Sequence, residues 1–447
     1  MGKRNRNDQE ASGKTMKKGI LPFSFQNFQF SNVDRRIVKK HIFYLILISI
    51  ITKLVVLFVT VPVFHSFIDL FDFGYYLEHG MMVLQGQIPY VDFPFDYPPL
   101  ALIPILIALI PAVLTNNGYA FVGTFQILML ACDILISVCI YFICLKIYDE
   151  KRAFLAAALY SAAFSTAYFV LTKYDAVPTC LLMVAVLFTI YGMNVKGYIA
   201  NAAGFLAKLY PLIALPFLVA FNAKKTSLKH ELLQAVKVFV PVSLIVLVPF
   251  ILLKPAILLQ YISGSLVRTD VYVNTPTYTI YTVLHGVLGL GISSAMVSNL
   301  MYCVLGITLL LLLVLAFRKD RFGPETLLKF ILLAVFVVVF CMKYHSPQYF
   351  LWFTPFICIL IADSIQKIVL FFVVQILTFI EFPLMFGTYY TNGNYLMPAG
   401  SAGWYVTLLF FILEYSTLML LVYSVVIPSG TPIKTVWETI KNCAKSR

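Results

Sequence analysis

The sequence predicts an all-α polytopic membrane protein. Of its 447 residues, 61% are hydrophobic and only 12% are charged, whereas a soluble domain is about half apolar and a quarter charged. Long apolar runs recur along the whole chain, and a helix needs about 20 apolar residues to cross a bilayer. These observations exclude a water-soluble globule, and they exclude a disordered chain, which has the opposite composition.

Ten apolar runs are long enough to be predicted as membrane-spanning helices. We expect residues 1–41 and 428–447 to be cytoplasmic tails on either side of a transmembrane domain at 42–427. The predicted spans lie near residues 42–64, 121–146, 153–171, 176–194, 235–253, 298–317, 326–342, 350–366, 368–386 and 404–427.

The basic N-terminal segment indicates how the chain is oriented. Residues 1–40 contain ten Lys and Arg against three Asp and Glu, and the net charge is +13. Basic residues near spans stay on the cytoplasmic side of a membrane. We therefore expect both termini to be cytoplasmic, and we prefer this interpretation to binding of a nucleic-acid partner.

If every basic cluster lies on the cytoplasmic side, two apolar segments cannot cross the membrane. Segment 98–114 carries four prolines, and we expect a helix at the outer face. Segment 198–221 is basic at both ends and contains Pro211, which breaks a helix. We expect a re-entrant hairpin with Lys208 at its tip. Irregular backbone at membrane depth is tolerated against protein or a water-filled cavity, so this tip is a candidate site.

The first outer loop, predicted at 65–119, is acidic. Between residues 65 and 97 it holds five acids and no Lys or Arg: Asp69, Asp72, Glu78, Asp92 and Asp96. Asp69 and Asp72 stand among large apolar residues, where carboxylates are desolvated or paired and are often functional. Their spacing puts them on one helix face and does not choose between them.

Further ionisable residues fall on the same outer face, which includes a second loop at 254–297. They are Lys173, Asp175, Arg268, Lys343 and His345. Such groups at membrane depth are costly and indicate function, although a single lysine can also extend to the interface. Together they favour a site in which cations bind a phosphate and a carboxylate takes a proton from a hydroxyl.

The cysteines do not indicate a metal site. The chain has eight, mostly inside apolar runs and without CxxC spacing. Neither a zinc site nor a disulfide framework is predicted. No cofactor is predicted, and a requirement for a divalent metal is left open.

Four segments in order resemble a known pattern. They are Asp72-Phe-Gly-Tyr-Tyr with the following 86–100, Lys173-Tyr-Asp-Ala-Val-Pro, Ala207-Lys-Leu-Tyr-Pro-Leu, and Ser346-Pro-Gln-Tyr-Phe-Leu-Trp. The set resembles the membrane glycosyltransferases of the GT-C fold, and within them glycosyltransferase family 87, the polyprenyl-phosphate-mannose-dependent mannosyltransferases. The last segment also resembles the GPI mannosyltransferase that adds the first mannose. That enzyme is expected to carry Asp-x-Asp in the first loop, whereas Asp69 and Asp72 have two residues between them.

The resemblance implies a GT-C-like fold and transfer of a hexose, namely mannose. The donor would be a polyprenyl or dolichyl phosphate and the acceptor a hydroxyl of a lipid-linked compound or glycan, on the extracytoplasmic or lumenal side. It implies Asp72 as general base with inversion at the anomeric carbon, and Asp69 as a possible acidic partner. The expected phosphate-binding residues are Lys208, Lys343, Arg268 and His345. The expected substrate-binding residues are Tyr76, Tyr90, Asp92, Tyr97, Lys173, Asp175, Gln348 and Tyr349. Lys173 and Asp175 are alternatively expected to form a structural ion pair.

Two other classes of protein remain open at this stage. A transporter or lipid flippase also uses broken helices and intramembrane charges, but it places them near the midplane in repeated halves. A non-catalytic subunit of a transferase complex would be favoured by loss of the base, and Asp72 is present.

Overall fold

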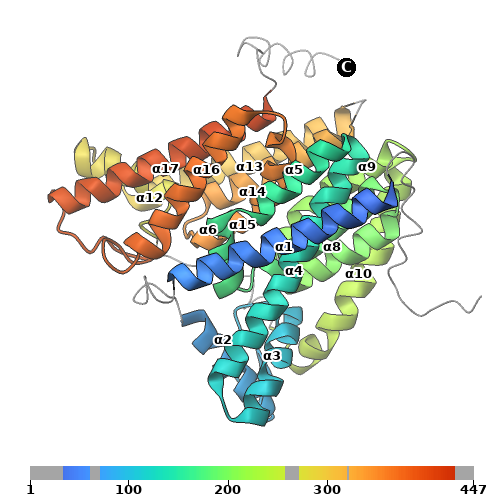
Figure 1. The fold of residues 1–447 in the computed structure, drawn as a ribbon. Coiled ribbons are helices and arrows are strands. Elements are labelled where there is room, and N and C mark those ends of the chain that lie inside the picture. The colour runs from blue at the N-terminus through green and yellow to red at the C-terminus, as the bar shows by residue number, and fades with distance from the viewer. Residues whose placement is uncertain (1–33, 61–70, 257–270, 320–321, 428–447) are drawn as a thin grey trace, which may run out of the picture.

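The computed structural model describes residues 34–60, 71–256, 271–319 and 322–427, and these fold into helices (Figure 1). Over these ranges, the β-type pairing consists of isolated backbone bridges. The long helices pack into one bundle, and a smaller lobe that contains α2 and α3 projects from it (Figure 1). The all-α prediction is confirmed.

Within the described ranges, seven helices are long and apolar enough to cross a membrane. They are α1 (Arg35–Thr60), α4 (Gly118–Ile147), α10 (Leu228–Leu253), α13 (Ser294–Arg318), α14 (Pro324–Cys341), α16 (Ile365–Phe379) with its continuation η7 (Ile380–Met385), and α17 (Ala402–Val426). The pair α5 (Glu150–Ser161) and α6 (Phe164–Thr172), bent by 56°, makes an eighth if it is one span. The chain is therefore an integral multi-pass membrane protein.

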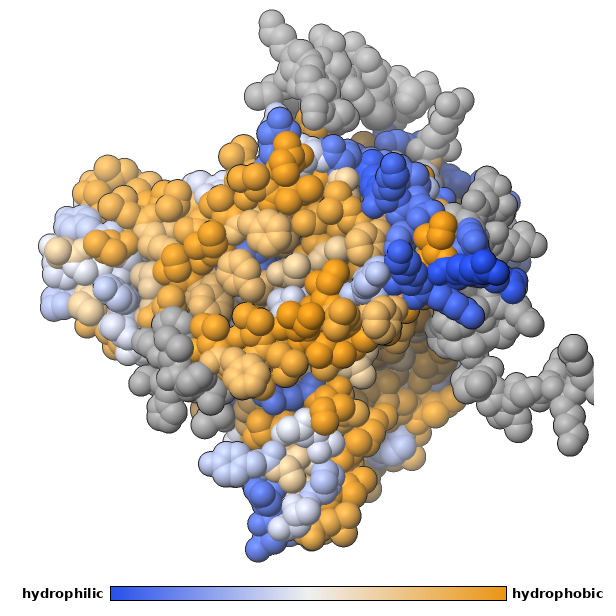
Figure 2. Space-filling model, in the orientation of Figure 1, coloured by the Kyte–Doolittle hydropathy of each residue, from blue (hydrophilic) through white to orange (hydrophobic). Residues whose placement is uncertain are grey.

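The surface has the pattern of a membrane protein. Figure 2 shows a wide apolar surface over the long helices, with hydrophilic atoms gathered where α1 begins and at the end of the projecting lobe. α10 and α13 have few buried residues in their apolar stretches. Such exposed apolar faces are stable against lipid tails and not against water.

The predicted count of ten spans is not confirmed. The runs at 176–194 and 350–366 form α7 (Ala176–Ile190), with 15 residues, and α15 (Phe350–Ile361), with 12 residues after the short turn η6 (Pro347–Tyr349). Both helices are apolar and largely buried, but shorter than a full span. Each follows a non-helical segment whose polar residues, among them Lys173 and Ser346, line a cavity.

The predicted hairpin is present. α8 (Asn194–Ala207) leads to Lys208 in an extended conformation, and the chain returns through η4 (Tyr210–Ala214) and α9 (Leu215–Ala223). Asn222 Nδ2 donates to the Tyr198 hydroxyl at 3.0 Å, so the return limb ends beside the first. Asn201 Nδ2 donates to the Pro211 carbonyl at 2.8 Å and ties the turn down. Lys208 therefore lies at the turn, as the charge pattern predicted.

The segment predicted to be the first outer loop forms the projecting lobe. It consists of α2 (Phe71–Leu84), the turn η3 (Pro99–Ala101) and α3 (Leu102–Thr115), which packs against α2 and α4. The proline-rich apolar segment is thus a short helix beside the long ones. Residues 276–293 likewise contain only the short α12 (Pro276–Tyr281) and η5 (Thr282–Val287), and α13 begins at Ser294.

A buried ion pair joins α1 to α4, and breaking it is expected to destabilise the protein. Lys53 Nζ lies 2.6 Å from Asp133 Oδ2, and the two side chains are 2% and 0% exposed. The change Lys53→Met leaves the Asp133 charge buried without its ammonium, which costs about 3–5 kcal/mol. The double change Lys53→Met with Asp133→Leu should recover most of this loss. The free energy of unfolding in mixed micelles measures the loss in the single variant and the recovery in the double variant. A single variant as stable as the double variant would contradict the prediction.

Candidate functional site

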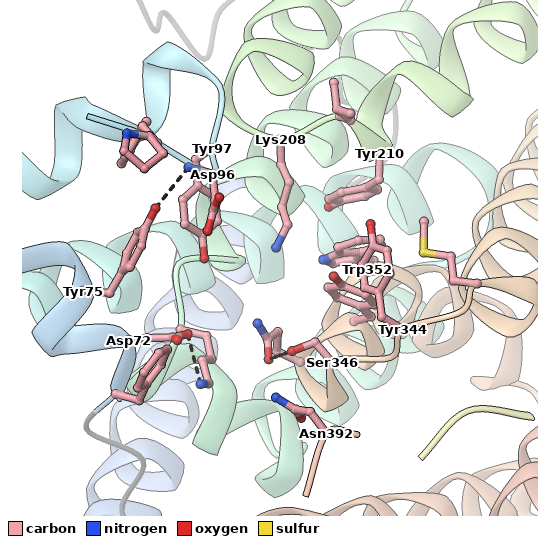
Figure 3. A pocket seen from close by; sticks show the side chains of 18 of the residues that line it. Asp72, Tyr75, Asp96, Tyr97, Lys208, Tyr210, Tyr344, Ser346, Trp352 and Asn392 are labelled. Atoms are coloured by element: carbon pink, nitrogen blue, oxygen red, sulfur yellow. Dashed lines mark hydrogen bonds and ion pairs between the residues drawn. The ribbon is translucent and has the colours of Figure 1, made fainter. Parts of the chain in front are cut away.

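A cavity of about 1110 Å³ lies between the projecting lobe and the ends of the helices. Its walls come from several separate parts of the chain: the first loop, the α6–α7 break, the hairpin turn, Lys254 after α10, Tyr272, the segment from the end of α14 to α15, and η7 with the loop that follows. Figure 3 shows acids, lysines and aromatic rings from these parts facing one space.

The first polar group of the cavity is the pair formed by Asp72 and Lys173. Asp72 lies in the first turn of α2, and Lys173 follows the last residue of α6 in an extended conformation. Lys173 Nζ is 3.0 Å from Asp72 Oδ2, with the side chains 6% and 17% exposed. An ammonium at this distance forms a charge-assisted hydrogen bond with a carboxylate.

The second polar group is centred on Asp175, which is fully buried at the start of α7. Its Oδ1 accepts hydrogen bonds from Lys208 Nζ and from Trp352 Nε1, both at 2.6 Å. One carboxylate oxygen therefore holds the hairpin lysine and the indole of α15 in fixed positions. Lys208 keeps its charge compensated while its ammonium faces the cavity (Figure 3).

Aromatic rings form the wall around Lys208. Trp352 stacks between Tyr210, at 4.1 Å and 3°, and Tyr349, at 4.0 Å and 29°. Lys208 Nζ lies 5.1 Å from the Trp352 ring centroid and 5.6 Å from that of Tyr97. These distances suit cation–π attraction, which holds an ammonium without neutralising it.

A hydroxyl on the other side of the cavity belongs to Tyr75. It accepts a hydrogen bond from the Asp96 backbone N–H at 3.0 Å. Burial raises the pKa of Tyr75, and the charges of Asp96 and Asp72 add to this. The phenol therefore stays protonated and can act as a hydrogen-bond donor but not as a base.

Most predicted substrate-binding residues do meet at the cavity: Tyr90, Asp92, Tyr97, Lys173, Gln348 and Tyr349 line it. Asp92 also accepts a hydrogen bond from the Ile88 N–H at 2.7 Å, which stabilises its turn. Tyr76 is not in the wall. It is fully buried, stacks on Phe125 at 5.2 Å, and its hydroxyl lies 3.3 Å from that of Tyr97.

The alternative of an ion pair between Lys173 and Asp175 is wrong. Lys173 pairs with Asp72, and Asp175 pairs with Lys208. Lys173 is extended while Asp175 begins a helix, so the two side chains leave the break toward different partners.

Two of the residues expected to bind phosphate do not line the cavity. Lys343 Nζ lies 5.5 Å from the ring centroid of Tyr302. His345 is buried, and burial lowers its pKa to about 4, so the imidazole is neutral at physiological pH. Lys208 is the phosphate-binding candidate that does line the cavity. Asp69 and Arg268 lie outside the described residues.

Sequence reasoning missed two cavity residues that carry polar groups. Lys254 follows α10, and its Nζ donates to the Tyr90 carbonyl at 3.0 Å. Its position directly after an apolar span was a usable signal. Asn392 comes from the loop after η7 and has no local signal at all. Within the described part of the chain, no three His, Cys, Asp or Glu side chains are grouped to hold a metal ion.

The fold and the cavity together define a multi-pass helical membrane protein with a large pocket lined by Asp72, Lys173 and Lys208. Asp175 is fully buried behind this wall and contacts the pocket through Lys208. Comparison of the sequence with protein-family models and with curated proteins finds no match. Among solved structures, the chain is similar to the oligosaccharyltransferase of Archaeoglobus fulgidus, which was crystallised with a tethered acceptor peptide containing the NVT sequon. The identity is 12% and the TM-score 0.38, over 90% of this chain and 57% of the other. The chain thus spans little more than half the length of that protein.

Proposed function

We propose that the protein is a GT-C-type glycosyltransferase that moves a hexose, namely mannose, from a polyprenyl or dolichyl phosphate to an acceptor hydroxyl. The observation that carries this proposal is the pairing of Asp72 with Lys173 and of Asp175 with Lys208 around one cavity. The cavity thus holds a partly exposed carboxylate that can take a proton and an ammonium that can hold a phosphate.

The proposed reaction assigns one role to each group. Asp72 takes the proton of the acceptor hydroxyl as its oxygen attacks the anomeric carbon. The bond between that carbon and the phosphate oxygen breaks on the opposite side, so the configuration is inverted. The leaving lipid phosphate gains negative charge, which Lys208 stabilises through a charge-assisted hydrogen bond.

The cavity also has a wall suited to a lipid chain. Leu212 and Ile213 of η4 and Val338 and Met342 at the end of α14 line it beside the polar groups. Leu212 is 39% exposed. An isoprenoid chain along these residues would bury apolar surface while its phosphate reaches Lys208. On this proposal the cavity opens to the extracytoplasmic or lumenal side, and both termini are cytoplasmic.

Transfer from a defined donor tests the proposal. Purified protein in sealed proteoliposomes is incubated with polyprenyl-phosphate mannose carrying a radiolabel in the sugar, together with a membrane lipid and glycan extract as acceptor. GDP-mannose serves as the comparison donor. We expect label to enter a product from the lipid donor and none from the nucleotide sugar. Movement of the intact donor across the bilayer without cleavage of the sugar–phosphate bond would indicate a flippase and overturn the proposal.

A further inference from the structure

One side of the cavity is built from three segments joined by backbone hydrogen bonds. We call residues 272–274, 343–348 and 386–395 the cavity floor. The Tyr272 N–H donates to the Lys343 carbonyl at 2.7 Å, and the Val273 N–H donates to the Asn392 carbonyl at 3.0 Å. Segment 272–274 therefore bridges the other two, which are far apart in sequence.

A buried polar network holds the floor in place. Glu381, 1% exposed, accepts hydrogen bonds from Asn274 Nδ2 at 2.9 Å and from the Tyr390 hydroxyl at 3.1 Å. Asn274 Nδ2 also lies 3.3 Å from the His345 carbonyl, and the Tyr415 hydroxyl donates to the Asn274 carbonyl. One network of hydrogen bonds around the buried Glu381 carboxylate thus links all three segments.

The floor presents uncharged polar side chains to the cavity. Ser346, Gln348 and Asn392 line it, and Figure 3 shows Ser346 and Asn392 facing the side that carries Asp72. The Ser346 hydroxyl donates to Gln348 Oε1, which fixes the orientation of that amide. Amide and hydroxyl groups both donate and accept hydrogen bonds, as the hydroxyls of a sugar ring do. A phosphate instead favours cations, which stand elsewhere in the cavity.

We propose that Asn392, together with Ser346 and Gln348, forms a subsite that binds the hydroxyl groups of a sugar ring lying between Asp72 and Lys208. This inference rests on the proposed function and deepens it. The ring belongs either to the transferred sugar or to a sugar of the acceptor, because both carry the same hydroxyl chemistry. Asn392 is the specificity residue, because the floor holds its backbone and leaves its amide at the cavity.

Binding measurements test the subsite without relying on turnover. Citronellyl phosphate and citronellyl-phosphate mannose are titrated against detergent-solubilised protein, and methyl mannoside is titrated separately as a probe of an acceptor sugar. The variants are Asn392→Ala and its matched control Asn394→Ala, whose exposed side chain belongs to the same loop but does not line the cavity. Loss of one neutral hydrogen bond corresponds to a roughly fivefold change in Kd.

Asn392→Ala is expected to weaken binding of a sugar-bearing probe about fivefold and to leave the bare lipid phosphate unchanged. Weaker binding of citronellyl-phosphate mannose assigns the subsite to the transferred sugar. Weaker binding of methyl mannoside alone assigns it to a sugar of the acceptor. Equal weakening of all probes, or an equal effect of Asn394→Ala, overturns the subsite but not the proposed function. A wild-type protein that binds neither lipid phosphate overturns both.

Discussion

Replacement of Asp72 by asparagine is expected to slow sugar transfer by about 10²- to 10⁴-fold, the range typical for loss of a general base. Asparagine has nearly the same shape and keeps an oxygen that can accept a hydrogen bond from Lys173. In the unchanged protein Lys173 Nζ lies 3.0 Å from the Asp72 carboxylate. The fold should therefore survive while the group that takes the proton is lost. Initial rates with the radiolabelled lipid donor measure the effect.

Two further variants make this result specific. Glu78→Gln removes an exposed acid from the same helix, α2, outside the cavity wall, and should leave the rate unchanged. Asp69→Asn tests the second acid of the predicted pair and should retain activity. If Asp72→Asn transfers sugar as fast as the wild type, Asp72 is not the base.

Lys208→Met is expected to lower kcat/KM for the lipid donor by about 10- to 100-fold, because a hydrogen bond to a charged group is worth about 1.5–3 kcal/mol. The same change removes the ammonium that lies 2.6 Å from the buried Asp175 carboxylate in the unchanged protein. Breaking such a pair costs about 3–5 kcal/mol of stability. The loss of activity must therefore be separated from a loss of folded protein.

The double variant Lys208→Met with Asp175→Asn achieves that separation. It removes both charges and keeps an amide oxygen for the Trp352 N–H, which donates to Asp175 at 2.6 Å. We expect the melting temperature in detergent to rise toward that of the wild type while donor kcat/KM stays low. Recovery of activity together with stability would show that Lys208 does not bind the donor.

Much of the fold follows from hydropathy and charge, because both act locally. An apolar run long enough to span is stable only in lipid or protein, and basic residues on one side limit which runs can cross. That reasoning predicted Lys208 at a turn, and in the structure the return limb brings Asn222 back to a hydrogen bond with Tyr198. It overestimated the lengths of α7 and α15, because the apolar runs continue through residues that are no longer helical.

The candidate site was predictable only where a single segment carries an unusual residue. Asp72 among aromatic residues and a lysine before Pro211 are such cases. Which lysine pairs with which acid depends on backbone direction at the breaks, and this is set by packing between distant helices. The cavity position of Asn392 depends on the backbone hydrogen bond that its carbonyl accepts from Val273, about 120 residues away along the chain. No local sequence pattern encodes this contact.

The order of the cavity floor along the chain has a consequence for biosynthesis. Asp72, Lys173 and Lys208 are translated early, but the floor is completed by residues 386–395 and held by Tyr390 and Tyr415 near the C-terminal end of the described chain. A nascent chain that stalls after α15 would carry the acid, both lysines and floor residues 272–274 and 343–348, but not residues 386–395. A product truncated at that point therefore cannot assemble the complete pocket.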